Sequence, residues 1–325
     1  MTVSTGPLVS PADAYEIQRV CEEYDRPDVP VMTRESFLAR LDHPMPGQAF
    51  EHHLGFLDGV PVGYVQIGLP ETDNLNNVNV VLFVLPAHRR RGVGRALFDV
   101  VRERARAAGR RHVIGEVASR HPDGAAFAAA LGARPGLEEV RSRLDVRATD
   151  RARLGAFLRD AWRHAEGYGL IQWTGVPPEE IIDDVARLEG SFHGEAPTGD
   201  LPWEPEKVDA DQIRQGELLR ERHGRVTYNT GAMIRERLVG WTMIVGSRAD
   251  PAHAWQSITL VDRAHRGHRL GMLLKVANLS HVRESRAGLE VIDTFNADSN
   301  EHMLRINRAM GFRAVDRATY WQLAV

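Results

Sequence analysis

The sequence predicts two copies of one α/β domain, joined head to tail. The first observation is an apolar run, Val78 to Val84, followed by an Arg- and Gly-rich turn and an amphipathic helix. The second is that this succession recurs around Arg266, 177 positions after Arg89 (266 − 89). The third is a later helix end, where Gly311 follows Gly132 by 179 positions (311 − 132). Landmarks that recur at nearly one offset indicate a duplicated domain rather than a short repeat.

The composition is that of a globular protein with room for two cores. A chain of 325 residues suits two domains of roughly 150 residues each. The net charge of −3 argues against a broad nucleic-acid surface, and the single Cys21 excludes an internal disulfide framework and a Cys-based zinc site. Neither a signal peptide nor an apolar run of 18 residues is present. We therefore expect a cytoplasmic protein without a membrane partner, as a monomer or homodimer.

The first copy is expected over residues 1–147, beginning with a short strand or arm. Pro11 to Tyr24 places its apolar residues on one helical stripe, and Thr33 is the expected N-cap of the next helix. Asp58-Gly59 between two apolar runs predicts a β-hairpin. The later elements are expected at 78–85 (strand), 93–108 (helix), 112–117 (strand), 123–131 (helix) and 137–146 (strand).

The second copy is expected over residues 148–325. Pro177-Pro178 interrupts its beginning, and the three prolines between Gly194 and Pro205 predict a loop. Helices are expected at 150–166, 179–188, 210–222 and 300–310, and from Leu270 onward. Strands are expected at 168–173, 225–234, 238–245, 255–261, 291–296 and 313–323.

The turn after Val84 has the properties of an anion site. Glycine allows a ligand to approach the backbone closely, as at Gly92 and Gly94. The first N–H groups of the following helix lack internal partners, and the helix dipole is positive there. Neighbouring arginines add positive charge. A merely solvated Arg-rich helix start is the plain alternative, because only Lys207 and Lys275 among 41 basic residues are lysine.

The motif Arg89-x-x-Gly92-x-Gly94 resembles the pyrophosphate-binding motif of the GNAT superfamily, the acyl-CoA-dependent N-acyltransferases. It matches neither a dinucleotide-binding Gly-x-Gly-x-x-Gly nor a Walker loop. The resemblance implies, in each copy, a mixed and mainly antiparallel sheet flanked by helices. It also implies acetyl-CoA as the acyl donor and a small-molecule amine as the acceptor. The tandem arrangement is similar to mycothiol synthase and related two-domain acetyltransferases.

The resemblance further implies that acetyl-CoA contacts the strand end and the turn. In copy one these residues are Val84, Leu85, Arg89, Arg90, Arg91, Gly92, Val93, Gly94 and Arg95. In copy two they are Leu260, Val261, Arg266, Gly267, His268, Arg269, Leu270 and Gly271, together with Asn296, Asn300 and Asn307. Copy two departs from the motif because Arg269 stands where its first glycine belongs. Either copy, or both, is a candidate site, and copy one has the better turn.

The proton-handling groups are not at the positions common in the family. Neither strand before a turn contains a carboxylate, and Ala128 and Asn307 stand where many members have a tyrosine. Because an amine of pKa about 10 must lose a proton before it attacks, another base is needed. The candidates are His53 and Glu71 in copy one, and Glu204, Tyr320 and the C-terminal carboxylate of Val325 in copy two. A surface or packing role stays open for each, and no histidine pair shows metal-ligand spacing.

These observations favour an N-acetyltransferase that works by direct attack of the amine in a ternary complex. The alternative is a non-catalytic acyl-CoA-binding sensor or pseudo-enzyme, which the missing acid and base favour. A nucleotide or nucleic-acid binder is a third reading, and the negative net charge disfavours it.

Overall fold

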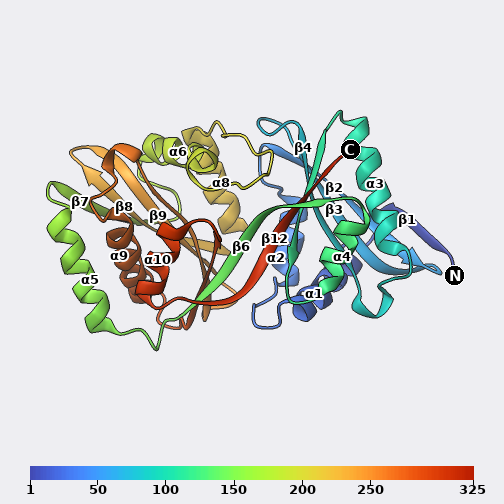
Figure 1. Ribbon diagram of the computed structural model, residues 1–325, viewed down its shortest axis with the longest axis horizontal. Coiled ribbons are helices and arrows are strands. Elements are labelled where there is room, and N and C mark those ends of the chain that lie inside the picture. Colours follow the sequence, from blue (N-terminus) through green and yellow to red (C-terminus); the bar gives the residue numbers. More distant parts are fainter. The chain divides into compact units, whose positions relative to one another are not determined.

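A computed structural model describes residues 1–325, except for the side chain of His193 (Figure 1). The chain forms two compact units. Unit 1 contains Met1–Glu138, Thr198–Glu204 and Arg317–Val325, and unit 2 contains Glu139–Pro197 and Pro205–Asp316. The sequence predicts continuous domains at 1–147 and 148–325. The units differ from that division because a loop segment and the end of the chain belong to unit 1.

Unit 1 is a mixed sheet with helices on both faces. Its strands lie in the order β1-β2-β3-β4-β5-β12, in which β4 and β5 are parallel and the other paired neighbours antiparallel. The strands are β1 (Val3–Pro7), β2 (Gln48–Leu57), β3 (Val60–Pro70), β4 (Asn77–Val84), β5 (His112–Ala118) and, from residue 317, β12 (Arg313–Ala324). The helices are α1 (Pro11–Asp25), α2 (Arg34–Asp42), α3 (Val93–Ala107) and α4 (Pro122–Ala130).

Local signals place these elements as the sequence predicts. The Ser10 hydroxyl accepts from the Asp13 N–H at the start of α1, and Thr33 caps α2 in the same way. Asp58 and Gly59 both have positive φ, 50° and 82°, which is the backbone of a tight β-hairpin turn between β2 and β3. The predicted hairpin and both predicted helix starts are therefore confirmed.

The two faces of the unit 1 sheet have different helices (Figure 1). On one face α3 buries Val93, Leu97 and Val101 against the strands, and Phe127 of α4 joins the same cluster. On the other face α1 and α2 pack around Phe37. Because side chains alternate along a strand, this division tells which face each strand residue occupies.

Unit 2 repeats the architecture, with strand order β6-β11-β10-β9-β8-β7 and a parallel pair of β10 and β11. The strands are β6 (Arg134–Asp145, in this unit from residue 139), β7 (Tyr168–Thr174), β8 (Arg225–Ile234), β9 (Arg237–Ser247), β10 (His253–Val261) and β11 (Val291–Ala297). The helices are α5 (Arg151–His164), α6 (Ile182–Gly190), α7 (Phe192–Glu195), α8 (Ala210–Arg222), α9 (Leu270–Ser285) and α10 (Glu301–Met310).

Three predicted boundaries in these elements are wrong by a few residues. The helix α6 begins at Ile182 rather than Glu179, because a turn from the Ile181 N–H to the Pro178 carbonyl precedes it. The short helix α7 extends into the start of the loop expected at 194–205. The strand β6 begins at Arg134, three residues before the predicted start. In the part of the chain that the structure describes, no helix is long and apolar enough to cross a bilayer.

A buried ion cluster fixes β6 against β11. The carboxylate of Asp293, fully buried, accepts hydrogen bonds from Arg143 at 2.7 and 2.8 Å, from Arg141 at 3.0 Å and from His253 at 3.0 Å. Arg141 also donates to Asp316 at 2.7 and 2.8 Å. Burial alone would raise the pKa of Asp293. Hydrogen bonds from Arg143 and His253 and the charges of Arg143 and Arg141 outweigh it, and lower this pKa to about 2.

We predict that Asp293→Asn destabilises unit 2 by about 3–5 kcal/mol, because it leaves a buried guanidinium short of its counter-ion. Equilibrium unfolding in urea measures the change. The matched control is Glu284→Gln on the exposed side of α9, which should stay within about 0.5 kcal/mol of wild type.

The pH dependence of this stabilisation follows from the lowered pKa. An Asp whose folded pKa lies below its unfolded value of about 3.9 stabilises fully above that value. The contribution of Asp293 should therefore persist down to about pH 4 and disappear as the pH falls through about 2. A difference from wild type below 1 kcal/mol at pH 7 would contradict this account.

Candidate functional site

The central feature of unit 1 is a gap between two parallel strands. Among the described residues, β4 and β5 pair only from Asn77 to Asn79 with His112 to Ile114. Beyond these pairs β4 continues along β3, and β5 continues along β12. The backbone groups of β4 and β5 that face each other beyond Asn79 and Ile114 therefore lack ladder partners. Backbone in this state offers donors and acceptors to an extended ligand.

Unit 2 has the same gap. Here β10 and β11 pair only from His253 to Trp255 with Val291 to Asp293, and each strand then follows its other neighbour. The predicted Asn296 lies on the free part of β11 and accepts from Asn307 Nδ2 at 2.7 Å. Asn307 Oδ1 is buried and has no hydrogen-bond partner among the described residues. Asn300 serves as the N-cap of α10.

The two Arg- and Gly-rich turns have the same backbone conformation. In copy one Arg90 and Gly92 have φ of 63° and 90°. In copy two the corresponding Gly267 and Arg269 have φ of 89° and 55°. Each turn thus has one glycine and one arginine at the two left-handed positions, in opposite order. The departure from the motif at Arg269 does not alter the path of the chain, because Arg269 adopts the conformation that Gly92 adopts in copy one.

The two turns differ in whether their arginines are paired with acidic side chains. In copy one Arg90, Arg91 and Arg95 are exposed, and no acidic side chain among the described residues pairs with them. Arg89, in contrast, forms hydrogen bonds and ion pairs within unit 1. Its Nε donates to the Val84 carbonyl at 3.1 Å, and its guanidinium lies 3.4 Å from the Asp25 carboxylate and 3.3 Å from that of Asp123.

Other predicted contacts of copy one also have partners inside the fold. The Leu85 N–H donates to the Val62 carbonyl at 3.0 Å, so this group is not free for a ligand. Val93 is buried in the core under the sheet. A Cβ at Gly94 would lie 3.5 Å from the Phe127 ring, an ordinary contact. The groups left for a ligand are therefore the three exposed arginines, the first amides of α3 and the gap-facing backbone of β4.

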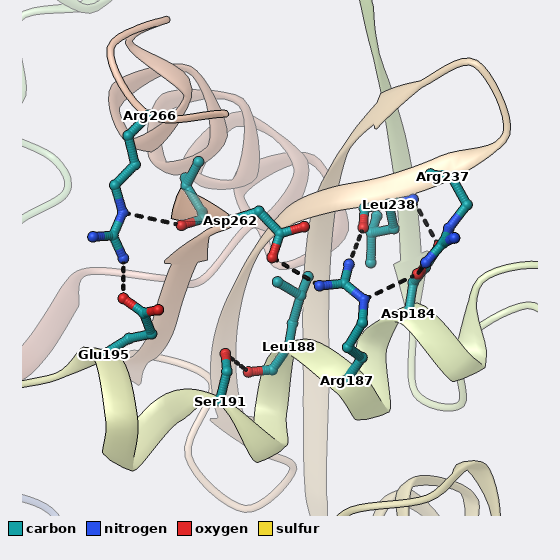
Figure 2. A network of polar contacts seen from close by, with 10 residues as sticks. Asp184, Arg187, Leu188, Ser191, Glu195, Arg237, Leu238, Asp262 and Arg266 are labelled. Carbon is teal, nitrogen blue, oxygen red and sulfur yellow. Dashed lines mark hydrogen bonds and ion pairs between the residues drawn. The ribbon is translucent and has the colours of Figure 1, made fainter. Parts of the chain in front are cut away.

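In copy two, carboxylates of the chain itself pair with the arginines of the turn. Figure 2 shows Glu195 of α7 against Arg266, with an Oε2–Nη2 distance of 2.5 Å. Arg263 lies 3.7 Å from the same carboxylate, and Arg269 forms an ion pair with Asp160 of α5. Arg266 Nε donates to the Val261 carbonyl at 3.3 Å, as Arg89 does to Val84 in copy one.

A second network ties the same strand end to α6. Arg187 donates to Asp262 at 2.7 Å and to the Leu238 carbonyl at 2.9 Å (Figure 2). Asp262 is half-buried and directly follows β10. Its N–H donates to the Val239 carbonyl. Asp184 accepts from Arg237 and from the Leu238 N–H at 3.0 Å. Burial would raise the pKa of Asp184, and these hydrogen bonds lower it overall.

The other predicted residues of the second turn also have places in the fold. His268 contacts the His164 carbonyl at 3.1 Å, and Leu270 is buried in a core cluster. Leu260 is paired with Trp241 in the sheet. Gly271 lies against Ile306 of α10.

A carboxylate and a phenol meet at the gap of unit 1, and the sequence reasoning found only one of them. Glu116 lies on β5 two residues beyond the last paired residue, and Tyr320 of β12 is its direct cross-strand partner. Directly opposed residues project from the same face of a sheet. The Glu116 side chain is 32% exposed and forms an ion pair with Arg26, the C-cap of α1, so this is the face that α1 covers.

Glu116 escaped prediction because β12 is assigned by sequence order to copy two, whereas it pairs with β5 in unit 1. Tyr320 and Val325, expected in copy two, belong to unit 1 with the end of the chain. Glu204, also expected in copy two, belongs to unit 1 through the separate segment Thr198–Glu204. Only a pairing signal between residues 116 and 320 could have indicated the arrangement, and a single sequence does not contain one.

The remaining candidates lie elsewhere in unit 1. His53 projects on the α3 face, 4.0 Å from Glu51, which Arg104 holds with two hydrogen bonds of 2.6 Å. Glu71 is exposed just after β3, with its N–H bonded to the Gly47 carbonyl. The structure does not bring these two residues together with Tyr320. The Asn74 side chain donates from Nδ2 to the Glu204 carbonyl and accepts at Oδ1 from the Glu204 N–H. The Val325 N–H donates to the Arg111 carbonyl at 3.0 Å.

Unit 2 has different side chains at the positions of Glu116 and Tyr320. By strand register these are Phe295 of β11 and Arg141 of β6, which are direct partners. Phe295 stacks on Trp255 of β10, with ring centroids 5.6 Å apart and planes 9° apart. Arg141 is bound to two aspartates as described above. The counterpart of the unit 1 site is therefore lined by aromatic rings and a neutralised cation.

Comparison with known proteins relates these features to a family. Residues 12–133 match the family model described as acetyltransferase (GNAT) family. A mycothiol acetyltransferase from Thermomonospora curvata is 29% identical over 273 residues, covering 80% of this chain and 77% of the relative.

Solved structures extend the likeness over both units. A tandem GNAT protein from the clavulanic acid biosynthesis pathway has a TM-score of 0.81 at 28% identity, covering 99% of this chain and 98% of its own. A GCN5-related N-acetyltransferase from Sphaerobacter thermophilus has a TM-score of 0.66 at 17% identity, covering 99% of this chain and 95% of its own, and supports the fold alone. Residues 12–133 therefore match the acetyltransferase (GNAT) family, and the chain as a whole is similar to tandem GNAT proteins, which supports an acyltransferase.

Proposed function

We propose that unit 1 transfers an acetyl group from acetyl-CoA to the amine of a small molecule, by direct attack in a ternary complex. One observation carries the proposal. The gap between β4 and β5 runs from a turn with three unneutralised arginines to the pair of Glu116 and Tyr320. The GNAT family uses acyl-CoA donors, and the name of the Thermomonospora curvata relative supports an acetyl donor.

The turn and the gap suit the two ends of a CoA thioester. Arg90, Arg91 and Arg95 surround the start of α3, a 15-residue helix whose amides and dipole favour a diphosphate. From Val80 to Val84 the free side of β4 extends about 13 Å, at roughly 3.3 Å per residue. Hydrogen bonds along this backbone would hold an extended chain as an added strand. When bound, the thioester supplies an activated acyl carbon at the narrow end of the gap.

Glu116 and Tyr320 are placed to handle the protons at that end. The amine nitrogen forms a bond to the acyl carbon as the C–S bond breaks, so the amine loses protons and the thiolate gains one. We assign Glu116 as the general base, held by its ion pair with Arg26. We assign Tyr320 as the proton donor to the sulfur, because it is the only one of the five predicted candidates on this face beside the gap.

Unit 2 is proposed to hold no acyl-CoA in the wild-type protein. Glu195 and Asp160 neutralise the arginines of its turn, and its counterpart of Glu116 is Phe295. A carboxylate already bound to Arg266 must be displaced before a phosphate can bind there, which costs affinity. One CoA per chain is therefore expected.

A charged substitution in the turn tests its role in CoA binding. Gly92→Glu should weaken CoA binding at least tenfold, because it adds negative charge and strains a position with φ of 90°. The matched control is Gly267→Glu, at a left-handed position of the second turn, which should leave the affinity within twofold. Isothermal titration calorimetry measures both, together with the stoichiometry. Equal losses of CoA affinity in the two variants, or an unchanged affinity in Gly92→Glu, would contradict the proposal that the copy-one turn binds CoA.

A neutral substitution of Glu116 tests its role as general base. Glu116→Gln should lower kcat about 100-fold or more without changing CoA affinity, since general-base catalysis contributes about 10²–10⁴. Thiol release from acetyl-CoA with a panel of amines measures the rate. Part of the loss should be recovered near pH 10, where more of the amine is already neutral. The control is Glu103→Gln on the exposed side of α3, which should keep wild-type kcat.

The same assay separates enzyme from sensor. Wild-type protein that binds one CoA but releases no thiol with any amine would favour the non-catalytic alternative. A Glu116→Gln variant with wild-type kcat would overturn the assignment of the base.

A further inference from the structure

A stretch of the unit 1 sheet is not covered by a helix. On the face that α1 covers, Asn79 and Val81 of β4, Glu116 of β5 and Tyr320 of β12 follow the start of the gap. We call these four residues the window. Asn79 is exposed, and Val81 is 43% exposed although it lies on an inner strand. The next residue along this face, Phe83, is covered by α1 and α2. An acceptor that reaches the narrow end of the gap from this face must therefore enter through the window.

The other side of the window is formed by residues 198–204, which we call the strap. In sequence the strap lies between α7 and α8, and it belongs to unit 1. Its far end is held by Asn74, whose Oδ1 accepts from the Glu204 N–H at 2.8 Å. In its middle the Pro202 carbonyl accepts from Asn77 Nδ2 at 2.9 Å, and Asn77 is the β4 residue just before Asn79 on this face.

The beginning of the strap, residues 199–201, is also fixed by hydrogen bonds and close packing. The Asp200 carbonyl accepts from Gln322 Nε2 at 2.7 Å, and the Asp200 N–H donates to the Gly136 carbonyl at 2.8 Å. Gly199 has φ of 60°, and a Cβ there would lie 2.1 Å from the Gly136 oxygen. Leu201 is 6% exposed. Hydrogen bonds at both ends and in the middle fix the strap in one position over β4 and β12.

The strap places one aromatic side chain at the window. The Trp203 ring meets the Tyr320 ring edge to face, with centroids 5.2 Å apart and planes 75° apart. Tyr320 is in turn the cross-strand partner of Glu116. A carboxylate, a phenol and an indole therefore follow one another along this side of the site. This sequence of groups suits a cation at the carboxylate end and an apolar body against the rings.

We propose that the strap is the specificity element of the acceptor site, and that Trp203 selects amines whose carbon skeleton has an apolar ring face. This inference rests on the proposed function of unit 1. The ammonium end of the acceptor lies at Glu116, and the ring of the acceptor packs on Trp203. Arg26 pairs with Glu116 and holds its carboxylate in place at this end of the window.

The test compares three amines in the acetyl-CoA thiol-release assay: phenethylamine, cyclohexylmethylamine and ethanolamine. Trp203→Ala should lower kcat/KM for the two ring-bearing amines at least tenfold and leave ethanolamine within twofold. Trp203→Phe, which keeps an aromatic face, should retain most of the preference. CoA affinity by calorimetry should be unchanged in both variants, which shows that unit 1 is folded.

A second variant changes the strap without touching the rings. Gly199→Ala forces the strap away from the Gly136 carbonyl and should reduce the preference for ring-bearing amines in the same direction. Wild-type kcat/KM for all three amines in both Trp203→Ala and Gly199→Ala would overturn the inference and leave the proposed function standing. Wild-type protein that binds CoA but releases no thiol with these three amines or with any amine of the wider panel would overturn the proposed function, and this inference with it.

Discussion

The whole site depends on two parallel strands that stop pairing after three residues. In an ordinary sheet the backbone groups of β4 and β5 would bond to each other along their full length. Here each strand instead keeps its outer neighbour, β3 for β4 and β12 for β5, and the inner edges are left to a ligand. The cost of the unpaired backbone is tolerated because water or a bound chain can satisfy it. The gap connects the turn at its wide end with the proposed base and acid, Glu116 and Tyr320, at its narrow end.

The two units have the same backbone plan and different charges around their turns. Both units have the gap, and both turns have left-handed backbone at the same two positions. The difference lies in side chains that neutralise the second turn: Glu195 against Arg263 and Arg266, and Asp160 against Arg269. The backbone of the turn is therefore the same in both units, although carboxylates of the protein pair with the arginines of the second turn. This is possible because packing and ligand recognition depend on different residues.

Much of the fold could be predicted from sequence because it rests on local signals. The Asp58-Gly59 turn, the Thr33 cap and the apolar stripe of α3 act over a few residues, and each is found where expected. The repeated turn was equally visible, because its glycines and arginines are contiguous. The predictions that concern which residues touch a ligand stay predictions, since the structure gives their places and not their ligands.

The part of the site that sequence reasoning missed is non-local. Glu116 and Tyr320 are about 200 positions apart and meet only because β12 pairs with β5 (320 − 116 = 204). The Glu195–Arg266 pair likewise joins residues 71 positions apart, through a loop whose path has no periodic signal. Strand pairing of this kind depends on tertiary packing and not on local propensity. For this reason the sequence alone could not predict that β12 pairs with β5, or that Glu195 pairs with Arg266.

The most direct test is a crystal structure of the protein grown with a saturating concentration of acetyl-CoA. We expect one molecule of acetyl-CoA per chain, with its diphosphate at Arg90, Arg91 and the start of α3. Its acyl carbon should lie between β4 and β5, beside Glu116. Acetyl-CoA bound instead in the gap between β10 and β11, with Glu195 displaced from Arg266, would contradict the central claim.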